Sequence, residues 1–208
     1  MSKMVKYPDG SIREISDGKN IKKVNYRKAK LGIDFESLIN NSNGYYLNNN
    51  IAAIYKKPTP IQIVKVDYPA RNKAKIVEAY YRVPSTTDYN GIYKQKYIDF
   101  EAKSCKEMNF SFERIYEHQV NHLEKIDNLG GISFLIIEFS SVNEIYVLPA
   151  KLLVEKFHES KLGGRKSLPY QYFCENGIKV EIKINQTIDY LTAVDTLFFD
   201  DKNKKGTV

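Results

Sequence analysis

The sequence predicts an α/β fold in which helices flank one mixed β-sheet and a two-stranded excursion projects from the body. Three observations support this class. Segments with the 3.6-residue period of helices alternate with extended runs rich in β-branched and aromatic residues. The length of 208 residues suits one sizeable domain with its own core. Two of the extended runs are joined by a basic loop.

Charge is distributed unevenly along the chain. The net charge is +7, and residues 1–30 and 56–82 each carry an excess of lysine and arginine. Such clustering favours a polyanionic partner, nucleic acid or anionic lipid, and the alternative is a solvated tail and loop. No stretch approaches the roughly 18–20 apolar residues of a membrane span, and the N-terminus has no signal-peptide pattern. We therefore expect a cytoplasmic protein without a membrane partner.

We expect the chain to consist of an N-terminal arm, residues 1–28, and a single domain, residues 29–208. Residues 1–28 mix glycine, aspartate, asparagine and lysine without a period, which is typical of a flexible basic arm. Residues 29–48 then show apolar positions at helical spacing, which predicts a helix carrying Glu36. Residues 51–57 predict a strand, because prolines follow at once.

Residues 61–83, here called the basic hairpin, read as two strands. The runs "IQIVKV" and "IVEAYYRV" are joined by "DYPARNKAK", which carries Arg71, Lys73 and Lys75. Three cations at the tip of an excursion could reach into nucleic acid. The alternative is an exposed hairpin whose charges prevent edge-to-edge pairing.

The second half predicts further strands and helices around the same sheet. The segment "NFSFERIYEHQVNHLEKIDNLGG" predicts a helix with Ser111 as N-cap and a glycine pair as its end, and Gln119 lies on its apolar stripe. The runs "GISFLIIEFSS" and "NEIYVLPA" predict strands. The run "AKLLVEKFHES" predicts a helix, and "TIDYLTAVDTLFF" is the segment that closes the fold.

The run "YIDFEAK" carries the chemistry. Side chains alternate across a strand, so Glu101 and Lys103 share one face, about 6.6–6.8 Å apart along the chain. The turn signal "DYNG" places Asp88 on a paired strand. Carboxylates brought together repel unless a cation joins them, and hard oxygen donors suit Mg²⁺ or Mn²⁺. Thr86 lies on the face of Asp88 and could join this shell.

Lys103 completes the predicted site. Beside a metal ion, its ammonium can stabilise the charge that develops on a phosphoryl group and can orient the attacking water. The alternative is a surface salt bridge between Glu101 and Lys103 beside a hairpin. The pair His118 and His122 has the spacing of a zinc pair but lacks a third ligand, so we interpret both as surface or DNA-facing residues.

The pattern of Asp88 followed by Glu101-Ala102-Lys103 resembles the core of the PD-(D/E)XK nuclease superfamily, which has the restriction-endonuclease-like α/β fold. The segments "KKPTPIQIVKVDYP", "AYYRVPSTTDYNGIYKQKYIDFEAK" and "FERIYEHQVNHLEKIDNLGGISFLIIEF" resemble the RecU family of bacterial Holliday junction resolvases. This resemblance runs over most of the chain, from about residue 29 to the C-terminal "YLTAVDTLFF".

The resemblance implies roles for individual residues. Thr86, Asp88, Glu101 and Gln119 would surround Mg²⁺, with Mn²⁺ as a substitute, and Lys103 would stabilise the transition state. Glu36 matches an acidic position that accompanies such sites, and here the preceding "NYRKAKLGIDFE" replaces the compact Asn-Arg-Gly of the family. The basic hairpin would be the stalk that enters a four-way junction, with Arg71 in contact with DNA. Lys73 and Lys75 in the same loop are further candidate DNA contacts, and Tyr81 could stack against bases at the crossover.

The resemblance also implies an activity and partners. We expect a magnesium-dependent endonuclease that resolves Holliday junctions by paired symmetric nicks during recombination and repair. It would act as a homodimer, in the cytoplasm at the nucleoid, with four-way junction DNA and further recombination proteins as partners. The alternatives are a non-catalytic architectural protein that binds four-way junctions, and a nuclease of the same fold with another branched DNA substrate.

Overall fold

The computed structural model describes residues 3–6, 12–15, 34–70, 72–82, 86–183 and 187–200. The chain divides into two units, Met1–Leu31 and Gly32–Val208. In the first unit, β1 (Lys3–Lys6) pairs antiparallel with β2 (Ile12–Ile15). This pair lies where the sequence predicted an arm without regular structure, since the segment shows no period-two pattern. The remainder of the predicted arm lies outside the described residues.

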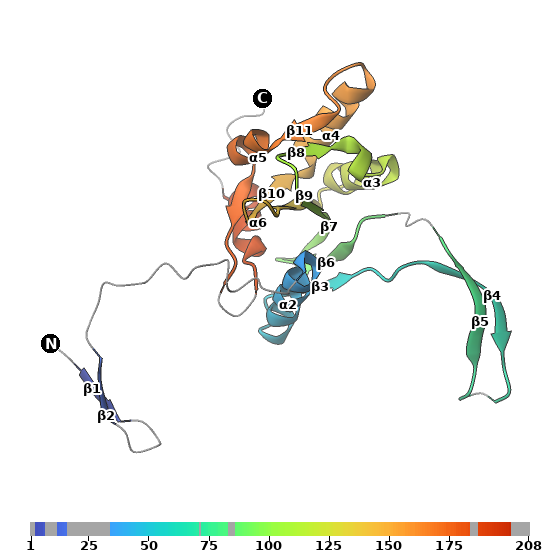
Figure 1. Ribbon diagram of the computed structural model, residues 1–208, viewed down its shortest axis with the longest axis horizontal. Coiled ribbons are helices and arrows are strands. Elements are labelled where there is room, and N and C mark those ends of the chain that lie inside the picture. The colour runs from blue at the N-terminus through green and yellow to red at the C-terminus, as the bar shows by residue number, and fades with distance from the viewer. Residues whose placement is uncertain are drawn as a thin grey trace. The chain divides into compact units, whose positions relative to one another are not determined.

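The second unit is built on a mixed six-stranded sheet in the order β12-β10-β9-β7-β6-β3 (Figure 1). Its strands are β3 (Ala52–Lys56), β6 (Tyr89–Tyr93), β7 (Lys96–Cys105), β9 (Ile132–Phe139), β10 (Glu144–Pro149) and β12 (Ile178–Val180). Only β7 and β9 run parallel within this sheet, and every other neighbouring pair is antiparallel. The predicted mixed α/β sheet is therefore confirmed.

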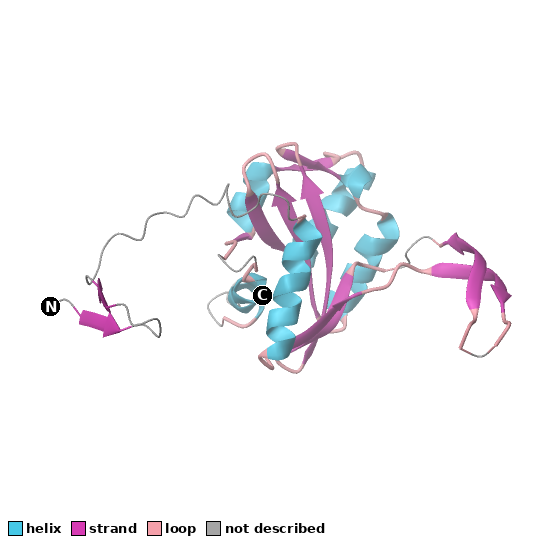
Figure 2. Ribbon diagram, turned by 60° about the horizontal axis from the view of Figure 1, so that its bottom comes forward, coloured by secondary structure: helices cyan, strands magenta, loops and turns pink. Residues whose placement is uncertain are grey.

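Helices cover both faces of the sheet (Figure 2). On one face α2 (Phe35–Asn48) and α6 (Tyr190–Phe198) bury a core with Ile54, Phe100 and Phe134. On the other face α3 (Glu117–Asn128), α4 (Ala150–Lys161) and α5 (Tyr170–Asn176) bury a second core with Leu135 and Ile137. A short pair, β8 (Asn109–Ser111) with β11 (Ser167–Pro169), flanks this second core.

Two helices start later than the sequence predicts: the helix expected over residues 29–48 begins at Phe35, and the helix expected after Ser111 begins at Glu117. Asp34 caps α2, and its side chain accepts from the Ser37 N–H at 2.7 Å. Ser111, predicted to cap the long helix, instead caps a 3₁₀ turn, Phe112–Arg114. The α-helix begins only at Glu117, with Tyr116 as its N-cap residue. The reason is that Ile115 has extended backbone and is buried, which interrupts the helix.

Three stacked aromatic rings fix the centre of the sheet. Tyr89, Phe100 and Phe134 occupy paired positions on β6, β7 and β9. The ring centroids of Tyr89 and Phe100 lie 4.9 Å apart, and those of Phe100 and Phe134 lie 4.6 Å apart. All three rings are fully buried, and offset stacking of this kind adds to the energy of burial. This stack sets the register between β6 and β7.

The turn between β6 and β7 is not where the sequence predicted it. Asn90 and Gly91, the expected turn residues, lie inside β6. The chain instead turns at Lys94 and Gln95, whose φ angles are 46° and 64°. Two consecutive left-handed residues are what a two-residue hairpin loop needs, and lysine and glutamine adopt them without the usual Asn-Gly signal.

Gly91 has a packing function rather than a turn function. A Cβ atom at this position would lie 2.0 Å from the carbonyl oxygen of Ala53 on β3. Glycine is required because the two backbones approach closely here, which is the usual reason for a glycine inside a strand.

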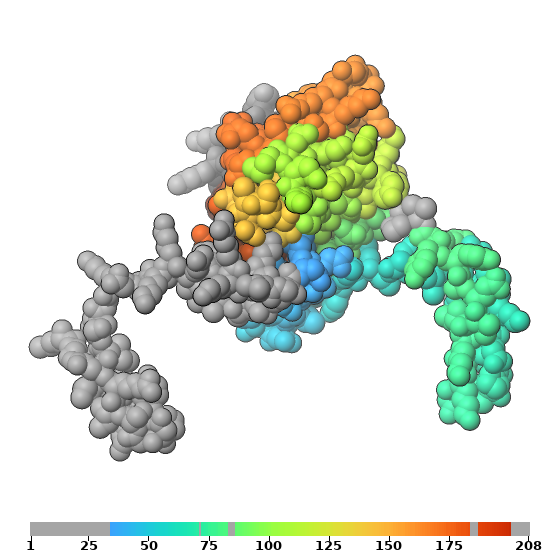
Figure 3. Space-filling view, viewed as in Figure 1, coloured from blue at the N-terminus to red at the C-terminus, as the bar shows by residue number. Residues whose placement is uncertain are grey.

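The basic hairpin is an exposed antiparallel pair. It consists of β4 (Ile61–Asp67) and β5 (Lys75–Tyr81), as the sequence predicted, and its register shifts at Lys65. Every described residue of both strands is exposed, including four aliphatic residues of β4. In the space-filling view the pair is separate from the sheet and its helices (Figure 3).

We expect Gly91→Ala to destabilise the protein by about 1–3 kcal/mol or more, because the added methyl group would force β3 away from β6. The matched control is Gly44→Ala within α2, where a Cβ atom meets nothing within 4 Å. That change should raise stability by about 0.5–1 kcal/mol, because alanine loses less entropy in a helix. Urea unfolding measures both, and equal stability of Gly91→Ala and the wild type would contradict the packing argument.

Candidate functional site

The end of the β6–β7 ladder brings Asp88 and Glu101 together. Tyr89 pairs with Phe100, so the next positions outward are Asp88 and Glu101. The Asp88 Oδ2 atom accepts a hydrogen bond of 3.1 Å from the Ala102 N–H. Two residues separated by 13 positions in the sequence thus meet at one point of the sheet.

Glu101 is the central residue of this cluster. It is fully buried, and its Oε1 atom lies 2.5 Å from Lys103 Nζ and accepts a 2.7 Å hydrogen bond from Gln119 Nε2 on α3. Its Oε2 atom is buried without a hydrogen-bond partner among the described residues. A buried carboxylate oxygen without a donor is costly, so this atom is a ready acceptor for a cation.

The electrostatics of Glu101 reflect this environment. Burial raises the pKa of the Glu101 carboxyl to about 7, the Lys103 ammonium acts in the opposite direction, and the Asp88 carboxylate raises the pKa further. Two carboxylates within electrostatic reach of each other repel unless a proton or a metal ion lies between them.

Gln119 is at the site, but its orientation differs from the expected one. The Gln119 Oε1 atom accepts a 3.1 Å hydrogen bond from the Tyr116 N–H, which closes the first turn of α3. Its amide nitrogen therefore faces Glu101. As a metal ligand through its side-chain oxygen, Gln119 would have to exchange the two ends of its amide, because nitrogen of an amide is a donor only.

Two other predicted residues lie at the margin of the cluster. Thr86 is half-buried two residues before Asp88, and the polar contacts of this segment are made by Thr87 instead. Glu36, in the first turn of α2, forms a 2.5 Å ion pair with Lys56 at the end of β3. Both members of this pair are exposed, so it contributes little to stability.

Sequence reasoning missed a second buried carboxylate, Asp99. It lies on the same face of β7 as Glu101 and is fully buried. Its partners are the side chains of Lys57, Thr87, Tyr97 and His122. Strand alternation in "YIDFEAK" could have placed Asp99 beside Glu101, but Lys57, Thr87 and His122 are distant from it in the sequence.

The predicted DNA contacts lie on the basic hairpin and are exposed where described. Lys73 and Lys75 lie at the tip of the hairpin, and Tyr81, near its base, is 85% exposed. Tyr80 is also exposed, and its hydroxyl donates to Glu78 at 2.9 Å. Arg71 lies outside the described residues.

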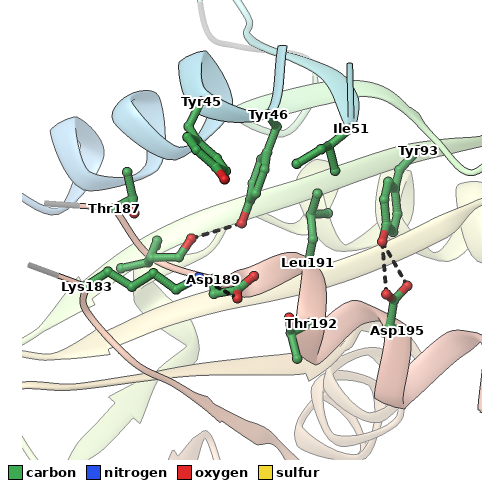
Figure 4. Close-up of a pocket in the computed structure, with 11 residues that line it drawn as sticks. Tyr45, Tyr46, Ile51, Tyr93, Lys183, Thr187, Asp189, Leu191, Thr192 and Asp195 are labelled. Atoms are coloured by element: carbon green, nitrogen blue, oxygen red, sulfur yellow. Dashed lines mark hydrogen bonds and ion pairs between the residues drawn. The ribbon is translucent and has the colours of Figure 1, made fainter. Parts of the chain in front are cut away.

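A pocket of about 320 Å³ lies elsewhere, between the end of α2 and the start of α6. Its lining includes Tyr46, whose hydroxyl donates to the Ile188 carbonyl at 3.0 Å, and Tyr93, whose hydroxyl bonds Asp195 (Figure 4). None of the predicted site residues lines it.

The residues at the β6–β7 ladder fit a divalent ion. Asp88 and Glu101 supply hard oxygen atoms, one of which lacks a partner, and Lys103 lies beside them. Within the described part of the chain, no group of three or more histidine, cysteine or acidic side chains could hold a metal. The remaining ligands would be neutral oxygen atoms, water or phosphate, as is usual for Mg²⁺.

Comparison with known proteins defines the class. Residues 30–196 match the family described as RecU: Recombination protein U. A Holliday junction resolvase RecU of Oenococcus oeni is 46% identical over 94% of this chain and 99% of its own length. Another, from Leuconostoc mesenteroides, is 49% identical over 86% of this chain and 87% of its own. This chain is thus one of the recombination proteins.

Within this class, the chain belongs to the RecU family. Among solved structures, the Holliday junction resolvase Hjc of Archaeoglobus fulgidus covers 65% of this chain and 88% of its own, with 12% identity and a TM-score of 0.40. Across the described ranges, no helix has the length and apolar character needed to cross a bilayer.

The raised pKa of Glu101 makes stability depend on pH. Its pKa is about 7 in the folded protein and 4.5 ordinarily, so the folded state holds the proton more tightly. The contribution of Glu101 to stability is therefore fully present below pH 4.5 and is lost as the pH rises through about 7. Between these limits the loss is on the order of 3 kcal/mol.

Urea unfolding in the presence of a chelator, at pH values from 4.5 to 8, tests this prediction. Relative to Glu101→Gln, which cannot ionise, the wild type should become progressively less stable as the pH rises. Parallel pH profiles for the two proteins would show that the carboxyl of Glu101 titrates normally.

Proposed function

We propose that this chain is a magnesium-dependent Holliday junction endonuclease that cuts two symmetric strands of a four-way junction. The observation that carries the proposal is the convergence of Asp88 and Glu101, with one buried oxygen lacking a partner. Membership of the RecU family supports the substrate, because the named relatives are Holliday junction resolvases.

The residues divide the chemistry between them. Asp88 and Glu101 would hold Mg²⁺, with Mn²⁺ as a substitute, and Thr86 and Gln119 would complete the shell. At these residues a bound ion would activate a water molecule for attack and would neutralise the charge that develops on the phosphate. Lys103, held by Glu101 at 2.5 Å, presents an ammonium that can stabilise the same charge. Glu36 is proposed only as an acidic neighbour of this site, since it pairs with Lys56.

We propose that the working form is a homodimer. Two symmetric incisions need two sites related by a two-fold axis. The exposed aliphatic residues of the basic hairpin support this proposal, because an isolated two-stranded pair is marginally stable in water and gains from a second surface. A cytoplasmic, nucleoid-associated location and further recombination proteins as partners complete the proposal.

We expect Asp88→Asn and Glu101→Gln each to reduce junction cleavage by more than about 100-fold, because loss of even an outer partner of a metal site typically costs 10–100-fold. Junction affinity without metal should be unchanged, since the cationic surface is retained. The assay uses a mobile four-way junction with labels on opposing strands, with and without Mg²⁺. The control is Glu144→Gln, a carboxylate on β10 that also accepts tyrosine and lysine hydrogen bonds.

Each outcome of this assay has a meaning. Paired nicks by the wild type and by Glu144→Gln, and not by the two site variants, support the proposal. Binding without nicks by the wild type would favour the architectural protein. Efficient cutting of linear duplex, or of another branched DNA in preference to the junction, would favour a nuclease with a different substrate.

We propose that the basic hairpin, including Arg71 and Tyr81, contacts the junction. Replacing both Lys73 and Lys75 by alanine should weaken binding and reduce the slope of log affinity against log salt by about 2, because each phosphate contact releases roughly one counterion. The matched control replaces Lys179 and Lys183, which lie at the opposite edge of the sheet, on and just after β12. Equal slopes for the two double variants would remove the hairpin from the interface.

A further inference from the structure

Asp99 is buried beside the proposed site at a high cost. Its carboxylate is fully buried, and a charge in that position is tolerated only when donors surround it. Lys57 Nζ lies 2.8 Å from its Oδ2 atom, the Tyr97 hydroxyl donates to the same oxygen at 2.9 Å, and His122 Nε2 lies 3.1 Å from it. The Thr87 hydroxyl donates to the other oxygen.

These donors come from four separate parts of the fold. Lys57 follows β3, Thr87 precedes β6, Tyr97 lies on β7 and His122 lies on α3. The carboxylate of Asp99 on β7 is therefore the point at which the end of β3, the start of β6 and helix α3 are joined by polar contacts.

Three of the four donors are also adjacent to a residue of the proposed metal site. Thr87 directly precedes Asp88, and the Lys57 backbone N–H donates to the Asp88 carbonyl oxygen at 2.8 Å. His122 lies one turn along α3 from Gln119. Asp99 itself is two residues before Glu101, on the same face of β7.

Both the side chain and the main chain of Lys57 are hydrogen-bonded in this cluster. Its ammonium bonds Thr87 Oγ1 and Asp99 Oδ2, both at 2.8 Å, and its main chain bonds Asp88. Its neighbour Lys56 points to Glu36 on the opposite side of the strand. The two lysines at the end of β3 thus have different functions, and only Lys57 connects to the carboxylates of β7.

We propose that Asp99 is a positioning residue for the metal site: through Lys57, Thr87 and His122 it fixes the backbone that carries Asp88 and the helix turn that carries Gln119. It contacts neither DNA nor metal. The inference rests on the proposed nuclease function, and it adds a requirement that the family resemblance did not supply. Outer partners of this kind typically contribute 10–100-fold in metal affinity or activity.

The test compares Asp99→Asn with Glu144→Gln, the matched carboxylate on β10. Glu144 bonds the hydroxyls of Tyr146 and Tyr170 and the ammonium of Lys179, so both variants remove one carboxylate charge from a tyrosine–lysine cluster in the same sheet. We expect Mn²⁺ binding, measured by calorimetry, to weaken 10–100-fold in Asp99→Asn and to remain unchanged in Glu144→Gln. Single-turnover cleavage should fall in the same proportion, while junction affinity in chelator is unchanged.

Lys57→Met is the second variant, and it decides the question if Asp99→Asn does not fold. It keeps the backbone N–H that bonds Asp88 but removes the connection to Asp99, so Mn²⁺ binding should again weaken. Wild-type Mn²⁺ affinity in these variants would overturn the positioning role even if the wild type cuts junctions. A loss shared equally with Glu144→Gln would mean a general loss of stability and would also overturn it. Failure of the wild type to cut, with Mn²⁺ affinity still lowered by Asp99→Asn, would refute only the nuclease proposal.

Discussion

The alternation of side chains along β7 is the constraint on which the rest of the structure depends. Ile98 and Phe100 enter the core beneath α2 and α6, so Asp99 and Glu101 must face α3, and both carboxylates are fully buried. Burial of two acids on one face of one strand is tolerated only with nearby donors. Asp99 has four, whereas one oxygen of Glu101 has none among the described residues. One acid is therefore saturated by protein groups and the other is open to a cation.

Much of this arrangement could be predicted from local patterns. Most strands of the sheet and the basic hairpin were predicted from extended runs rich in β-branched and aromatic residues, although β12 was not. The shared face of Glu101 and Lys103 follows from period-two alternation. The predicted position of the β6–β7 turn was wrong. Asn90-Gly91 is a strong hairpin signal, but Gly91 lies inside β6 and is needed for the close approach of β3. A sequence shows that glycine is present but not which neighbour makes it necessary.

The site was only partly predictable, for a related reason. Asp88 and Glu101 meet in the β6–β7 ladder, whose register is set by buried aromatic rings. Their contact can be predicted once these two strands are recognised as a hairpin. Lys57 and His122 reach Asp99 from β3 and α3, and no local pattern specifies which helix packs on which face. The amide orientation of Gln119 likewise follows from its hydrogen bond to Tyr116, a feature of the helix start that was predicted at Ser111.

The sheet contains two similar polar clusters, around Asp99 and Glu144, whose roles differ because of the residues beside them. Both carboxylates accept hydrogen bonds from tyrosine hydroxyls and a lysine, and each joins elements that are distant in the sequence. The partners of Glu144 connect β10 to β12 and α5, where no second acid lies adjacent on the strand. The partners of Asp99 flank Asp88 and Gln119 instead. Similar local chemistry therefore has a purely structural function at one side of the sheet, and at the other it positions Asp88 and Gln119 around the open carboxylate of Glu101.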